Sequence, residues 1–167
     1  MTLYNITDWL GLVPLFICMV FGVIGFVQSV KRKSLLKVDF DISILGIYYV
    51  IVILCYLIFE MRPINYRPVF INGYVEVSYP SSTTLLVLSV MPTLVFQADS
   101  RLKNDRIKTI IRLLSVLFSL FMITGRLISG VHWFTDIVGS VLISTGLFYT
   151  YKAIVLLFSK ERSGYGI

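Results

Sequence analysis

The segment from Gly125 to Asp136 holds the side chains in this sequence best suited to chemistry. Arg126, the single histidine His132 and the carboxylate Asp136 lie there between two apolar stretches. Ionisable groups at membrane depth are costly unless they are paired or line a wet cavity, so they suggest a functional site. On a helix starting near His132, Asp136 lies one turn on and orients one imidazole nitrogen, which leaves the other free to react. Arg126 adds a planar, permanent charge that suits phosphate.

A second group of polar residues lies between the second and third apolar stretches. Arg67-Pro68 belongs to this loop, and Pro80 is followed by a run of hydroxyl side chains, Ser81, Ser82, Thr83 and Thr84. We expect Pro80 in the first turn of a helix, where its missing N–H does little harm. A helix N-terminus with hydroxyl side chains binds anions, although such a run also serves as a simple helix cap. Together with Arg126 and His132, these residues indicate phosphoryl chemistry.

The composition is that of a polytopic membrane protein. Hydrophobic residues make up 57% of the 167 residues and charged residues only 14%, whereas soluble domains carry roughly 25% charged residues. A membrane-spanning helix needs about 20 apolar residues. We therefore expect an all-α, polytopic membrane helix bundle that forms one domain over residues 1–167, with about five spans near 9–30, 42–59, 79–98, 109–128 and 133–158.

The basic residues predict an orientation. Twelve of the fifteen follow the first span, lie between the third and fourth spans, or belong to the C-terminal end. The other three are Arg62, Arg67 and Arg126. The positive-inside rule then places the N-terminus outside and the C-terminus inside, with the site on the extracytoplasmic face of the cytoplasmic membrane. Because topology explains the net charge of +6, we expect no nucleic-acid partner.

The sequence shows no signature of a metal or cofactor site. Glu60, Glu76 and Asp136 do not have a recognised metal-ligand spacing, and we expect neither a metal nor a cofactor. Cys18 and Cys55 both lie inside apolar stretches, so we expect them to be packing residues instead of a disulfide or a metal pair.

The order of these motifs resembles the type 2 phosphatidic acid phosphatase (PAP2) superfamily of membrane lipid phosphatases. That family has three motifs: Lys-x6-Arg-Pro, Pro-Ser-Gly-His and Ser-Arg-x5-His-x3-Asp. The third matches at Arg126, His132 and Asp136, with Gly125 in the place of serine. The first matches at Arg67-Pro68 with Glu60 in the place of lysine. The second matches at Pro80-Ser81, with Ser82 in the place of glycine and Thr83 in the place of histidine. The resemblance covers roughly residues 55 to 150.

The resemblance implies a role for each matched residue. His132 would attack phosphorus and form a phosphohistidine, and Asp136 would orient its ring. Arg67, Arg126 and Ser81 would hold the phosphoryl oxygens, to which the hydroxyl run adds Ser82 and Thr83. The implied activity is hydrolysis of a lipid phosphomonoester or diphosphate. The expected partners are that substrate and the membrane lipids.

Two departures from the family motifs leave alternatives open. Thr83 leaves no histidine to protonate the leaving group, a contribution typically worth 10²–10⁴-fold. An active enzyme is then expected to prefer a diphosphate, whose leaving phosphate needs the proton less, or to relay it through water held by Thr83. Thr83 as an engineered replacement, an impaired relative that binds phospholipid or a partner without turnover, and a lipid phosphotransferase are the alternatives. Glu60 is expected to pair with Arg62 or Arg67.

Overall fold

The computed structural model describes residues 2–71 and 73–164, with side chains as far as residue 158. Within these ranges every regular element is helical, and five helical segments are long and apolar enough to cross a membrane, the first formed by α1 and α2 together. This confirms the expected all-α, polytopic bundle. The elements are α1 (Thr2–Leu10), α2 (Leu12–Arg32), the short 3-10 helix η1 (Leu35–Lys37), α3 (Phe40–Met61), α4 (Ser82–Arg101), α5 (Asp105–Ile128) and α6 (Phe134–Gly164).

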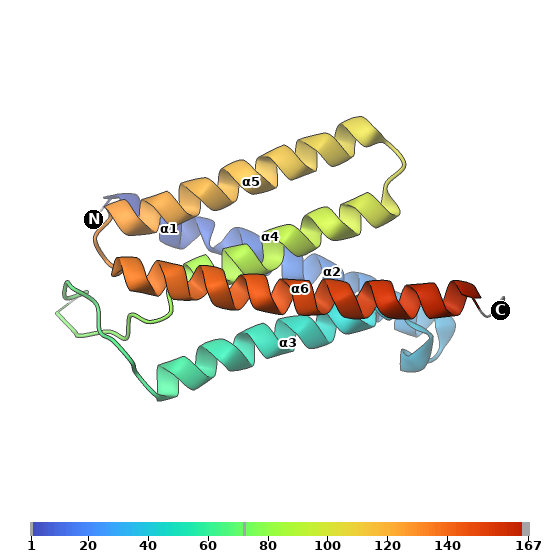
Figure 1. Ribbon diagram of the computed structural model, residues 1–167, viewed down its shortest axis with the longest axis horizontal. Helices are drawn as coiled ribbons and strands as arrows, with labels where there is room; N and C mark the ends of the chain where they lie inside the picture. Colours follow the sequence, from blue (N-terminus) through green and yellow to red (C-terminus); the bar gives the residue numbers. More distant parts are fainter. Residues whose placement is uncertain (1, 72, 165–167) are drawn as a thin grey trace.

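The long helices lie lengthwise beside one another, and consecutive ones run in opposite directions (Figure 1). One end of the bundle gathers α1, the 62–81 segment between α3 and α4, and the turn between α5 and α6. We call this the loop end. The opposite end carries η1, the turn between α4 and α5, and the last turns of α6. Because residues 31–37 and 101–112 lie there, we call it the basic end.

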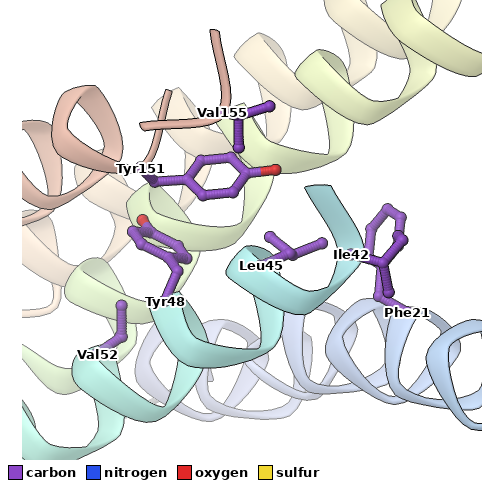
Figure 2. Close-up of a cluster of buried hydrophobic side chains, with 7 residues drawn as sticks. All are labelled: Phe21, Ile42, Leu45, Tyr48, Val52, Tyr151 and Val155. Atoms are coloured by element: carbon purple, nitrogen blue, oxygen red, sulfur yellow. The ribbon is translucent and has the colours of Figure 1, made fainter. Parts of the chain in front are cut away.

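Helix α4 forms the centre of the bundle. Half of the residues in its most apolar stretch are buried, and it packs against α2, α3, α5 and α6. Beside it, α2, α3 and α6 share a buried hydrophobic cluster, in which the rings of Tyr48 and Tyr151 face each other (Figure 2). The Tyr48 hydroxyl donates to the Ser89 carbonyl on α4 at 3.0 Å. Such internal partners are required in lipid, where no water satisfies buried polar groups.

Three helix starts differ from the predicted ones by three residues or more. The third begins at Ser82 because Ser81 is extended (ψ 106°), and its N–H donates to the Asp136 carbonyl at 3.3 Å. Pro80 therefore precedes the helix instead of lying in its first turn. The fourth begins at Asp105, because the Asn104 side chain accepts hydrogen bonds from two backbone N–H groups and caps the helix. The apolar residues alone do not predict this start, since the first turn is polar. The first span begins earlier than predicted, with the separate helix α1, which ends at Leu10.

Helix α1 packs closely against α5 at the loop end. Thr7 is fully buried, and a Cβ atom added to Gly125 would lie 2.6 Å from Thr7 Cγ2. The absence of a side chain at Gly125 therefore lets the two helices approach. This contact places α1 next to the end of α5 that carries Arg126.

Candidate active site

His132 and Asp136 form a buried pair at the loop end. Nδ1 of His132 lies 3.5 Å from Asp136 Oδ2 and 3.1 Å from the Ser78 carbonyl oxygen. A carbonyl oxygen only accepts, so Nδ1 carries the proton and donates it. Nε2 then keeps its lone pair. It is buried and has no hydrogen-bond partner among the described residues.

The two residues do not share a helix as predicted. Helix α6 begins at Phe134, so His132 lies in the turn before it. Gly130 begins this turn and has a positive φ of 68°. The Trp133 N–H donates to Asp136 Oδ2 at 2.9 Å. One carboxylate oxygen thus binds the backbone at the start of α6 and also faces His132.

Ser78 is a site residue that no motif indicated. Its hydroxyl donates to Asp136 Oδ2 in a short hydrogen bond and lies 3.2 Å from His132 Nδ1. The 62–81 segment folds back on itself to bring it there, since the Ser78 N–H donates to the Asn65 carbonyl at 2.9 Å. Trp133 Nε1–H donates to the Tyr66 carbonyl at 2.8 Å and attaches this segment to the start of α6.

Arg126 is only 2% exposed, although it belongs to a membrane-spanning helix. Its Nη2 donates to Asp8 Oδ1 on α1 at 2.8 Å and to Thr83 Oγ1 on α4 in a short hydrogen bond. Its Nε and Nη1 are buried, and within the described ranges no side chain or carbonyl accepts from them. Buried N–H groups normally have partners, so these two atoms are open to a ligand.

Arg67 repeats this arrangement. Its Nη2 lies 3.1 Å from Glu76 Oε2, whereas Nε and Nη1 are buried and have no partner among the residues described. The guanidinium carbons of Arg67 and Arg126 lie 5.8 Å and 5.1 Å from the centre of the Tyr4 ring. The two predicted phosphate ligands therefore converge on one ring and leave four buried nitrogens open.

Arg67, one of the two partners expected for Glu60, pairs with Glu76 instead. Glu76 forms the ion pair, because the folded-back loop places it opposite: the Arg67 N–H donates to the Glu76 carbonyl at 3.0 Å. Glu60 instead lines the neighbouring cavity together with Tyr56. Sequence spacing alone could not anticipate this pairing, since it depends on where the loop reverses.

The predicted hydroxyl cluster separates into three environments. The Ser81 hydroxyl is buried and lies 3.0 Å from Thr84 Oγ1. Ser82 lines the cavity that His132 and Arg67 also line. Thr83 accepts a hydrogen bond from Arg126 and so contacts the site through that arginine.

Two adjoining cavities lie at this site. The first holds about 280 Å³, and its lining includes Arg67, His132, Ser82 and Glu60. The second holds about 310 Å³ and is mainly apolar, with Asp8 and Thr83 among its polar lining. Tyr56 and Ser82 line both, so the polar hollow beside the histidine and the apolar one share these two wall residues. The apolar part is lined by Gly11, Leu12, Leu15, Val52, Ile53, Leu85 and Leu86.

Burial, together with the positive charges of Arg67 and Arg126, lowers the pKa of His132 below its ordinary 6.5, against the opposing effect of Asp136. A lowered pKa means that the ring is neutral at pH 7 and becomes protonated only as the pH falls further. Since His132 is the only histidine, its NMR signal in histidine-labelled protein is unambiguous. We expect a titration midpoint below 6.5 that rises in Arg67→Gln. A midpoint at or above 6.5 in the unmodified protein would contradict this charge assignment.

The family model of the PAP2 superfamily matches residues 37–160, which is most of the chain. The fold is similar to the crystal structure of a transmembrane PAP2-type phosphatidylglycerolphosphate phosphatase from Bacillus subtilis, with a TM-score of 0.60 and 19% identity over 87% of this chain and 76% of that one. No curated protein matches the sequence. The chain belongs to the PAP2 superfamily, as its motifs indicated.

Proposed function

We propose that this protein is a lipid phosphatase or diphosphatase that forms a phosphohistidine at His132. The observation that carries the proposal is the buried, unpartnered Nε2 of a histidine that lines a cavity together with Arg67. A neutral imidazole with its other nitrogen bonded to an acceptor is an activated nucleophile. The PAP2 fold supports the same class of reaction.

The reaction would proceed in two displacements at phosphorus. Nε2 of His132 forms a bond to phosphorus while the bond from phosphorus to the leaving oxygen breaks, and the leaving group takes the electron pair. The ring becomes cationic, and the carboxylate of Asp136, 3.5 Å from Nδ1, stabilises its charge. Water then attacks phosphorus, the N–P bond breaks, and phosphate and a proton are released.

The four open arginine nitrogens would bind the phosphoryl oxygens. Charge on these oxygens is best stabilised by donors already in place in a water-poor site, and the buried Nε and Nη1 atoms of Arg67 and Arg126 meet this condition. The apolar cavity beside Ser82 would take the first part of the lipid tail. We place the site on the extracytoplasmic face of the cytoplasmic membrane, because the opposite, basic end satisfies the positive-inside rule.

The substrate preference would follow from Thr83. A lipid alkoxide needs a proton in order to leave, whereas a phosphate leaving group needs it far less, so a lipid diphosphate is the proposed substrate. Phosphate release from phosphatidic acid, phosphatidylglycerophosphate and a polyprenyl diphosphate in detergent micelles tests this order. The diphosphate is expected to react fastest, and release from none of the three would contradict the proposed activity.

Thr83→His is expected to accelerate the monophosphate reactions by about 10²-fold or more, because it supplies a general acid. The diphosphate reaction should change little. Thr150→His makes the same substitution at an exposed position on α6 and should change neither rate. The measurement is kcat/KM for each lipid, and an equal gain on both substrate classes would contradict the assignment of a missing acid.

Phospholipid binding without turnover is a second candidate, favoured by the hydrogen bond that engages Thr83 with Arg126. It predicts that the protein binds lipid phosphates stoichiometrically and releases no phosphate from any of them. The three-lipid assay separates the two candidates, since one turnover per protein already excludes simple binding.

A further inference from the structure

Helix α1 lies outside the region that the family model matches, which begins at residue 37. It nevertheless supplies two side chains to the arginines of the site. Tyr4 contacts both guanidinium groups with its ring, and Asp8 forms an ion pair with Arg126. These residues are four apart, so they lie one turn apart on the same face of the helix.

The contact between Asp8 and Arg126 leaves particular atoms open. Both partners of Arg126, Asp8 and Thr83, engage the same nitrogen, Nη2. Nε and Nη1 stay buried and without a partner among the described residues. Glu76 engages only Nη2 of Arg67 and leaves the corresponding two nitrogens open. On each arginine a carboxylate thus fixes one nitrogen and leaves the other two for a ligand.

Asp8 is carried by a well-held segment. The Thr7 hydroxyl donates to the carbonyls of Leu3 and Tyr4 inside α1, and its methyl group packs where Gly125 has no side chain. At the other end of the helix, a Cβ on Gly11 would lie 3.4 Å from Thr83 Cγ2. Helix α1 is therefore packed against α5 and approaches α4, and it presents Asp8, whose side chain is 59% exposed, to Arg126.

We propose that α1 is an active-site element and that Asp8 is a positioning residue, which holds Arg126 so that its Nε and Nη1 face the phosphate. The proposal rests on the proposed function. A guanidinium attached at one nitrogen to a carboxylate loses the freedom to turn away, and correct orientation of such donors before the reaction accounts for much of their effect.

Three other roles for Asp8 make different predictions. As a simple counter-ion it would affect stability alone. As a competitor of phosphate for Arg126 it would weaken binding, so its removal would strengthen it. As a proton donor or acceptor it would act on the reactants directly and independently of Arg126. The experiment separates these roles.

The test uses the full-length protein in detergent, with Asp8→Asn, Asp8→Glu, Arg126→Gln and the double variant Asp8→Asn/Arg126→Gln. We measure kcat and KM for the diphosphate, inhibition by vanadate and the unfolding temperature. Asp8→Asn is expected to lower kcat/KM by about 10- to 100-fold and to weaken vanadate inhibition. Asp8→Glu, which restores the charge, should recover most of this loss. In the Arg126→Gln background Asp8→Asn should cause no further loss.

The matched control is Asp41→Asn, which removes a carboxylate 2.5 Å from Arg101 at the basic end. It should leave kcat/KM unchanged. Should Asp8→Asn fold poorly, Gly125→Ala displaces α1 through Thr7 without changing any charge, and it should also lower kcat/KM. Unchanged kinetics in both variants would overturn the proposal.

Two further results would overturn it. One is tighter vanadate inhibition in Asp8→Asn, which identifies Asp8 as a competitor. The other is a loss of equal size in the Arg126→Gln background, which identifies a direct chemical role. If the unmodified protein turns over none of the lipids, the proposed function is wrong, but this result does not decide the role of Asp8. Vanadate binding measured directly on the same variants still decides whether Asp8 positions Arg126.

Discussion

His132→Asn is expected to reduce phosphate release from every lipid by at least about 10⁴-fold, since removing a nucleophile abolishes the covalent route. Asparagine retains a polar side chain of similar reach but has no basic nitrogen to attack phosphorus. The ring is only 5% exposed, and its Nδ1 bonds to Ser78, so the unfolding temperature must be measured alongside kcat/KM. A variant that stays folded and loses release supports the nucleophile.

A control for this substitution is Tyr151→Phe. It removes a buried polar atom that accepts from Gln97 at 2.9 Å, within the hydrophobic cluster of α2, α3 and α6. Its phosphate release should match that of the unmodified protein. Retained turnover in His132→Asn, at more than about one hundredth of the normal rate, would remove His132 from the mechanism.

Arg126→Lys is expected to lower kcat/KM by about 10²–10³-fold, the usual cost of losing a donor to the developing negative charge. Lysine keeps the charge but lacks the planar group that serves Asp8, Thr83 and phosphate at the same time. The loss should appear in vanadate inhibition as well as in kcat, because the same nitrogens bind the analogue.

Arg112→Lys makes the same substitution on the same helix, at the basic end. Its side chain is 59% exposed and pairs with Asp99 at 3.0 Å, so the ammonium group can replace it. We expect no change in kcat/KM. Equal losses in the two variants would show that any arginine on α5 is needed for folding, and would contradict a specific role for Arg126.

Much of the fold could be predicted because the membrane constrains it strongly. A long uncharged run such as the one in α3 crosses lipid as a helix, because a helix satisfies its backbone hydrogen bonds within one segment. The ends were less predictable because they depend on single interactions. The Asn104 N-cap makes α5 start earlier in the sequence than predicted, and the hydrogen bond from Ser81 to Asp136 makes α4 start later.

The part of the candidate site that lies in one short segment could be predicted from the sequence. Arg126, His132 and Asp136 lie within eleven residues, and the structure brings His132 and Asp136 together. Ser78 and Asp8 could not be foreseen, since they reach the site through the folded-back loop and the packing of α1 on α5. Asp8 is 118 residues from its partner Arg126, and no local pattern connects them.

Trapping the covalent intermediate tests the central claim most directly. Protein mixed with lipid diphosphate carrying ³²P in its terminal phosphate is denatured within one turnover at alkaline pH, where phosphohistidine persists, and the labelled peptide is identified. We predict label on the peptide that contains His132, and none in His132→Asn. Release of labelled phosphate by the unmodified protein with no label on that peptide, or with label on another residue, would contradict the account.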